Sequence, residues 1–129
     1  MRCAYDYALV RVVPRVERGE FINAGVIVSC QEQDFLAARI ELDETRLLAL
    51  APDVDLEFIR INLASIPLIC QGGTQAGPIG LLSQRERFHW LVAPRSTIIQ
   101  TSPVHVGRCA DPVAALEHLL ATMVHSTPA

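Results

Sequence analysis

The strongest constraint on the fold is a succession of three β-rich segments joined by short polar connections. Residues 5–13 alternate between apolar and polar side chains, and residues 21–30 (FINAGVIVSC) and 35–42 are again rich in β-formers. The first connection, PRVERGE, begins with Pro14 and contains Gly19, which suits a turn. Short connections of this kind join antiparallel neighbours. The sequence therefore predicts a three-strand antiparallel meander.

The hydrophobic period changes to a helical one after this region. Asp43 can cap a short helix over residues 44–51, ended by Pro52, and Asp53 or Asp55 can cap a longer one. The longer helix carries an apolar stripe at three- and four-residue steps, formed by Leu56, Ile59, Leu63, Ile66 and Cys70. Pro67 lies inside this stripe and is expected to kink or end the helix.

The second half of the chain is predicted from shorter signals. Residues 71–80 read as a glycine-rich linker. Ser83 and Glu86 have the spacing of a capping box, but RFHWLV at residues 87–92 alternates and predicts a fourth strand after a single turn. We expect a fifth strand at residues 96–100, a loop at 101–110 and a final helix beginning at Asp111 and Pro112.

These elements predict one α+β domain over residues 1–129. Its antiparallel sheet would have about five strands and begin with the meander, and about three helices would pack mainly on one face. Half of the residues are hydrophobic, which suits a compact core. No apolar run approaches the roughly 18 residues that cross a membrane. The first residues lack the pattern of a signal peptide, so we expect a cytoplasmic protein that does not insert in a membrane.

Charge and composition exclude several kinds of chemistry. All eleven basic residues are arginine, which rules out a Schiff-base lysine and a P-loop lysine. The net charge of −3 makes nucleic acid an unlikely partner. The four cysteines and four histidines show neither C-x-x-C nor H-x-x-x-H spacing, so we expect free thiols, no metal and no cofactor.

One polar segment could bind an anion. Arginine binds carboxylate or phosphate through its fixed, always charged fork, and Ser and Thr hydroxyls directly follow an arginine near residue 95. The alternative is an ordinary polar corner between two strands. The candidate ligand-binding residues of this segment are Arg87, Trp90, Arg95, Ser96, Thr97 and His105.

The first hairpin could add two more residues to such a site. Arg11 is predicted to share a strand face with Tyr5 and Tyr7 and to lie across from Asn23. Either these two polar side chains satisfy each other, or they help to bind a ligand. Gly25 inside a strand indicates a bulge or a close approach by another chain. A regular strand would place Asn23 and Gly25 on one face, opposite Ile22, Ala24, Val26 and Val28.

The sequence assigns no catalytic residue. Ser96, His105 and Asp111 have the residue types of a nucleophilic triad, but nothing places the serine on an elbow or supplies an oxyanion hole. Whether the protein is an enzyme therefore stays open.

Two long blocks, YDYALVRVVPRVERGEFINAGVIV and RFHWLVAPRSTIIQTSPVHVG, followed by the Asp-Pro start of a helix, resemble an uncharacterised bacterial family, domain of unknown function 3037. The resemblance covers residues 5–124. It implies frequent gene adjacency to a kinase-like protein of the HipA type. We therefore expect an accessory or regulatory module that docks on a partner protein, with a HipA-like kinase as the expected partner. The alternative is a protein or enzyme that binds a small phosphate or carboxylate ligand, and an exposed sheet edge would also allow a homodimer.

Overall fold

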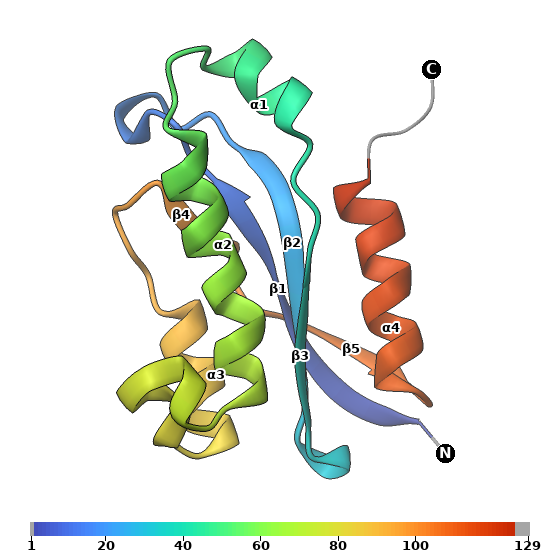
Figure 1. Ribbon diagram of the computed structural model, residues 1–129. Coiled ribbons are helices and arrows are strands. Elements are labelled where there is room, and N and C mark those ends of the chain that lie inside the picture. The colour runs from blue at the N-terminus through green and yellow to red at the C-terminus, as the bar shows by residue number, and fades with distance from the viewer. Residues whose placement is uncertain (1, 126–129) are drawn as a thin grey trace.

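The computed structural model describes residues 2–125 and shows an antiparallel sheet of five strands (Figure 1). The strands are β1 (Cys3–Val12), β2 (Ile22–Cys30), β3 (Phe35–Ile40), β4 (Ile99–Thr101) and β5 (His105–Cys109). Their order is β3-β2-β1-β4, and β5 pairs with the first half of β1. The expected meander and the α+β class are confirmed.

Helices cover both faces of this sheet (Figure 1). They are α1 (Glu44–Leu50), α2 (Leu56–Gln71), α3 (Gln84–Val92) and α4 (Pro112–Leu119), with the 3-10 turns η1 (Val16–Arg18), η2 (Gln31–Gln33) and η3 (Thr74–Leu81). The last helix continues as a π-helical turn, η4 (Leu120–Val124). There are more helices than the sequence predicted, and α4 lies on the face opposite α2. No helix within residues 2–125 is long and apolar enough to cross a membrane.

The helices begin where the sequence places capping side chains. Asp43 accepts a hydrogen bond from the Arg46 amide at the start of α1, and Asp55 accepts one from the Phe58 amide at the start of α2, both at 3.1 Å. Such caps satisfy amides that have no partner inside the helix. Pro67 does not end α2. The helix runs on to Gln71, and Ile69 and Cys70 in its last turn are buried.

The sheet separates two apolar cores. One core lies between the sheet and the layer of α1, α2 and α3, and includes Val10, Ile27, Ile59, Leu63 and Phe88. The other lies between the sheet and α4 with η4, and its buried members are Val26, Val28, Leu116, Leu119, Leu120 and Val124. Burying both faces explains why the central strand β2 is apolar along nearly its whole length.

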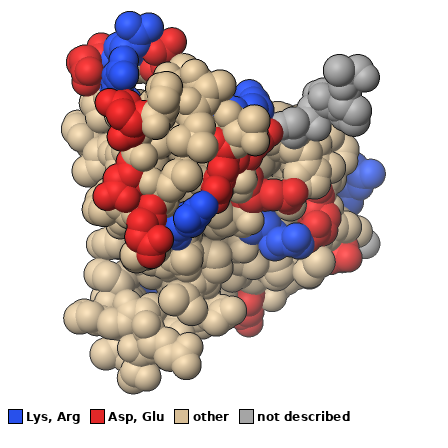
Figure 2. Space-filling view, turned by 45° about the horizontal axis from the view of Figure 1, so that its top comes forward, with Lys and Arg blue, Asp and Glu red and all other residues tan. Residues whose placement is uncertain are grey.

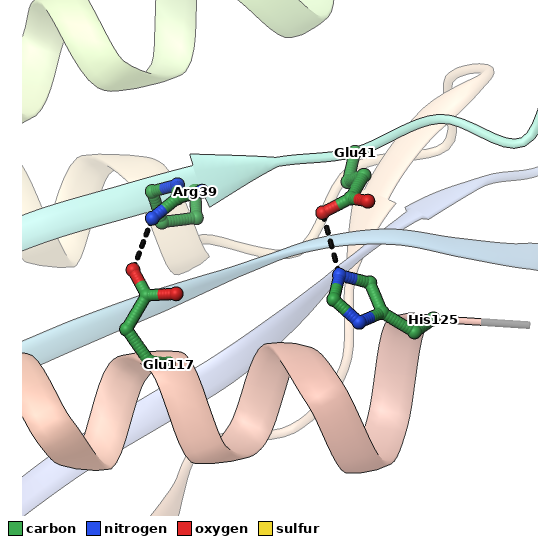
Figure 3. A network of polar contacts seen from close by, with 4 residues as sticks. All are labelled: Arg39, Glu41, Glu117 and His125. Carbon is green, nitrogen blue, oxygen red and sulfur yellow. Dashed lines mark hydrogen bonds and ion pairs between the residues drawn. The ribbon is translucent and has the colours of Figure 1, made fainter.

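Two polar side-chain contacts also link β3 and the residue that follows it to the α4 layer (Figure 3). Arg39 on β3 pairs with Glu117 on α4. Just after β3, the Oε2 atom of Glu41 lies 2.6 Å from the Nε2 atom of His125. All four side chains are substantially exposed, so these pairs add little to stability compared with the apolar contacts between the layers.

A β-bulge corrects the predicted faces of β2. Val10 pairs with Gly25 but Arg11 pairs with Asn23, so Ala24 is an extra residue in the ladder. Ile22 and Ala24 face the α2 core, whereas Val26 and Val28 face α4. A Cβ atom on Gly25 would lie 2.7 Å from the Arg39 carbonyl oxygen, which explains the glycine.

The predicted fourth strand is wrong, because residues 84–92 form α3. The capping box does form: Ser83 accepts from the Glu86 amide, and the Glu86 carboxylate accepts from the Ser83 amide. Phe88 and Leu91, one helical turn apart, are the residues buried in the core. The six-residue segment at residues 87–92 fits both periods, and burial of this pair favours the helix.

The stretches on either side of α3 also differ from expectation. Most of the predicted linker at residues 71–80 belongs to η3, and Gly72, Gly73 and Gly77 adopt positive φ in this segment. The strand predicted at residues 96–100 corresponds to β4, which begins only at Ile99. The loop predicted at residues 101–110 contains β5. The loop prediction failed because β1 is long enough to pair with two short strands in succession.

Ser102 forms the junction between β4 and β5. Its amide donates to the Leu9 carbonyl at 2.8 Å, and its hydroxyl accepts from the Leu9 amide, also at 2.8 Å. The same hydroxyl donates to the carbonyl of Pro103 at 2.9 Å. The side chain of a buried serine thus replaces a ladder hydrogen bond where a proline interrupts the strand.

Candidate functional site

A groove of about 210 Å³ opens between α2, α3 and β4. Phe58 and Ile66 of α2 form one side, Trp90 and Leu91 of α3 form the other, and Ile99 of β4 also lines it. Leu91 and Ile66 are buried, but Phe58 and Trp90 are 51% and 40% exposed. Two aromatic side chains therefore stand partly in solvent at an apolar hollow.

Arg95 forms part of the groove lining and caps α3. Its Nη1 and Nη2 atoms donate to the carbonyls of Leu91 and Trp90, at 3.0 and 2.5 Å. The last carbonyls of a helix have no partner inside the helix, so these bonds satisfy them. The guanidinium also lies over the Trp90 ring, 4.4 Å from its centroid. Among residues 2–125, no carboxylate forms an ion pair with Arg95.

The hydroxyl residues after Arg95 differ from each other. Ser96 is exposed on the loop before β4. The Thr97 hydroxyl donates to the carbonyl of Ile99 at 2.8 Å. The Thr97 carbonyl accepts from the side-chain amide of Gln100, also at 2.8 Å. Thr97 thus orders its own loop beside the groove, and Ser96 presents its hydroxyl to solvent.

Arg87 lies away from the groove lining and caps α2. Its Nη1 atom donates to the carbonyls of Ile69 and Cys70 at 2.8 and 2.6 Å, and its Nε atom donates to the carbonyl of Leu82 at 3.1 Å. A Cβ atom on Gly72 would lie 2.9 Å from the Arg87 Cζ atom. Burial raises the pKa of the Cys70 thiol to about 12, although the charge of Arg87 opposes this, so Cys70 is not an activated nucleophile.

Arg11 and Asn23 lie on the face of the sheet that carries α4. They pair across β1 and β2 as predicted, and Arg11 shares its face with Tyr5 and Tyr7. The Arg11 guanidinium lies over the Phe21 ring, 4.1 Å from its centroid, and the Asn23 amide donates to the Met123 carbonyl at 3.1 Å. The Arg11 Nε and Asn23 Oδ1 atoms are buried, and neither has a hydrogen-bond partner among residues 2–125.

His105 is the first residue of β5 and pairs directly with Tyr7 of β1. Its ring centroid is 5.3 Å from that of Tyr7. It therefore lies on the same sheet face as Arg11, opposite the face covered by α2.

The eight predicted ligand-binding residues are thus divided among three places. Trp90, Arg95 and Thr97 line the groove, and Ser96 lies in the same loop. Arg87 caps the other end of the helical layer, while Arg11, Asn23 and His105 lie across the sheet. The fold does not gather the guanidinium groups around one hollow. Their role in ligand binding stays a prediction.

An apolar surface that was not predicted from the sequence lies beside the groove. On α2, Ile61 is 62% exposed and Leu68 40% exposed, and they follow Phe58 at helical spacing. Leu81, at the end of η3, is 70% exposed. The sequence does carry a signal for this surface: residues 61–84 contain no Asp, Glu, Lys or Arg. Figure 2 agrees: its lower left part, in the region of η3, carries almost no charged side chain.

Comparison with known families supports the resemblance seen in the sequence. The family model described as a protein of unknown function, DUF3037, matches residues 7–124. The chain belongs to this DUF3037 family. No curated protein and no solved structure matches the chain. For this DUF3037 member, function must therefore be argued from its own surfaces.

Proposed function

We propose that this DUF3037 protein is an accessory module that docks on a partner protein through the groove and the adjoining uncharged face of α2 and η3. The observation that carries the proposal is the pair of exposed aromatic side chains, Phe58 and Trp90, at the mouth of an apolar groove. The energy of protein interfaces is concentrated in a few aromatic or arginine side chains near the centre of the patch. Interface centres are depleted of charged residues apart from arginine, and Arg95 is the charged residue that lines this groove.

The size of the groove favours a protein partner over a drug-sized ligand. Small-molecule sites usually enclose about 300–1,000 Å³. The groove holds about 210 Å³, which suits an apolar side chain inserted from a partner surface. Ile61 and Leu68 would then extend the contact along α2, because both already project into solvent.

The partner that we propose is a HipA-like kinase, which the family resemblance implies. The test is co-expression of the full chain with a kinase-like protein of the HipA type, followed by size-exclusion chromatography and calorimetric titration. We expect one co-eluting complex. Two separate peaks at micromolar concentration would overturn the choice of partner.

Substitution at the groove tests the docking surface itself. The double variant Phe58→Ala with Trp90→Ala is expected to weaken the complex at least about 30-fold, since loss of one hot spot costs about 2 kcal/mol or more. The matched control is Val113→Ala with Val106→Ala, which removes side chains that are 53% and 70% exposed on α4 and β5. Equal affinity of the two double variants, with unchanged melting temperatures, would contradict docking through the groove.

A small anionic ligand is the second candidate. Its support is the positive charge of Arg95, which has no carboxylate partner in residues 2–125, beside the exposed Ser96 hydroxyl. A ligand present at 100 times its dissociation constant would stabilise the fold by about 2.7 kcal/mol. A thermal-shift panel of phosphate esters and carboxylates tests this. An unchanged melting temperature across the panel would reject the ligand hypothesis without affecting the docking hypothesis.

A further inference from the structure

Three thiols gather at one end of the sheet. Cys3 is the first residue of β1 and Cys109 is the last residue of β5, and the two pair directly in the antiparallel register. Cys30, the last residue of β2, is buried, and its thiol donates to the carbonyl of Ala4 at 3.6 Å. All three cysteines are free thiols. This cluster lies on the opposite side of the sheet from the groove and is independent of the docking proposal.

The register between Cys3 and Cys109 fits a disulfide. Residues directly opposite each other in antiparallel strands point to the same face, with Cα atoms about 4.5 or 5.5 Å apart. Disulfides span Cα separations of about 4.4–6.8 Å, so both kinds of cross-strand pair qualify. Cys30 lies opposite Phe35 of β3 and not opposite a cysteine. The backbone therefore selects one pairing among the three thiols.

Accessibility selects the same pair. Cys3 and Cys109 are only partly buried, whereas Cys30 and Cys70 are fully inside. Both partners also lie at the ends of their strands, where small movements can bring the sulfur atoms to bonding distance without disturbing the central ladder.

We propose that Cys3 and Cys109 are a disulfide-forming modification site that reacts with a low-molecular-weight disulfide such as oxidised glutathione. One protein thiolate attacks the small disulfide, forms a mixed disulfide and releases one small thiolate. The second protein thiolate then attacks the protein sulfur and displaces the other small thiolate. The two protein thiols lose two electrons and two protons, and the small disulfide becomes two thiols.

The surroundings of the two thiols set the speed of this exchange. The hydrogen bond with Glu32 is the main cause that raises the pKa of Cys3, and burial is the main cause that raises the pKa of Cys109. A raised pKa leaves less thiolate near neutral pH, so exchange is slow there and accelerates as the pH rises. The equilibrium yield of the disulfide is therefore the readout, and the rate serves only as a check.

The new bond would secure the two ends of the fold together. It would close a loop that contains all five strands and the helices α1, α2 and α3, and long loops gain the most from closure. Cys109 lies just before Asp111, which caps α4 by accepting from the Val113 amide at 3.0 Å. The disulfide would thus fix the start of β1 to the strand from which α4 begins.

The experiment equilibrates the folded full chain at about pH 8.5 in glutathione buffers of increasing oxidised fraction, followed by acid quenching and peptide mapping without reduction. We expect a Cys3–Cys109 cross-link in the wild type and in Cys30→Ser and Cys70→Ser. The Cys3→Ser and Cys109→Ser variants should instead carry glutathione on the remaining partner. The oxidised wild type should also melt higher than the reduced form, by on the order of 10 °C.

The result is decisive in either direction. No intramolecular cross-link at the most oxidising ratio, or a cross-link that uses Cys30, would overturn the assignment. The same mixture of cross-links in folded and urea-unfolded chain would also overturn it, because the folded register would then not direct the pairing. An unchanged melting temperature between reduced and cross-linked wild type would overturn the claim that the bond closes the fold.

Discussion

For Arg87, a structural role and a ligand-binding role predict different effects of substitution on the stability of the fold. The sequence offers it as a ligand-binding arginine, but its donors contact the carbonyls of Ile69, Cys70 and Leu82. The substitution Arg87→Ala would leave two carbonyls of the last turn of α2 without their partner. Each unpartnered carbonyl costs about 1–3 kcal/mol when it is buried. Arg87 is only partly buried and water can replace some of this loss, so we expect unfolding free energy to fall by about 2–4 kcal/mol.

Urea denaturation followed by circular dichroism measures this loss. The urea concentration at the midpoint should fall. The slope of the unfolding free energy against urea concentration should stay constant, since the amount of surface exposed on unfolding does not change. Arg87→Lys should recover only part of the loss, because one ammonium group cannot reproduce a planar fork that contacts three carbonyls.

Arg108→Ala is the matched control. Arg108 is exposed on β5, and its side chain makes no hydrogen bond or ion pair among residues 2–125. Its replacement by alanine should therefore change stability by less than about 0.5 kcal/mol. If Arg87→Ala were as mild as this control, the helix-capping account of Arg87 would be refuted and its guanidinium would be free for a ligand.

Three further substitutions test the local geometry. Gly72→Ala should cost at least about 1 kcal/mol more than Gly73→Ala: both have positive φ, but only at Gly72 would a Cβ atom meet the guanidinium that caps α2. Equal losses in urea would contradict this. Ser102→Ala removes the acceptor of a β1 amide and should cost about 1–3 kcal/mol, whereas Ser96→Ala at an exposed site should cost less than about 0.5 kcal/mol in the same melts. Because burial raises the pKa of Cys70 to about 12 from 9.0, unfolding should become easier between those pH values, by up to about 1.4 kcal/mol per pH unit. Cys70→Ala should remove this contribution, so parallel stability curves for variant and wild type would refute it.

The three-strand meander was predictable because its signals are local. Alternation along residues 5–13 and 21–30, joined by a short turn, fixes two antiparallel neighbours before any tertiary contact is considered. The pairing of Arg11 with Asn23 followed from the same turn. The bulge at Ala24 was only hinted at by Gly25, so the side on which Val26 and Val28 lie was predicted wrongly.

The helix α3 was missed because six residues fit two periods. Phe88 and Trp90 alternate as in a strand, but Phe88 and Leu91 also lie one helical turn apart. Tertiary packing decides between these patterns: Phe88 and Leu91 are buried under α2, and Trp90 remains partly exposed. The capping box at Ser83 was the more reliable local signal, since it concerns backbone amides and not a short run of side chains.

The candidate site was less predictable than the sheet, because the partners of its arginines are backbone carbonyls. Arg95 caps the helix that immediately precedes it, but Arg87 reaches carbonyls of Ile69 and Cys70 on another helix. Residue type cannot reveal such partners, since every residue carries a carbonyl. The exposed apolar face could have been found, because the absence of charge over residues 61–84 is visible in the sequence.

The capping roles of Arg87 and Arg95 also determine which substitutions can separate docking from ligand binding. Arg95 closes the end of α3, so replacing it would disturb the wall of the groove as well as remove a positive charge. A loss of binding in Arg95→Ala would therefore follow from either hypothesis. Ser96 is exposed in the adjacent loop, and Phe58 stands at the groove with half of its surface in solvent. Replacing Ser96 changes a hydroxyl donor and leaves the groove intact, whereas Phe58→Ala changes the apolar contact and leaves both helix caps in place. A partner that responds to Phe58→Ala and not to Ser96→Ala recognises the apolar face, and the reverse pattern identifies an anion bound at the loop.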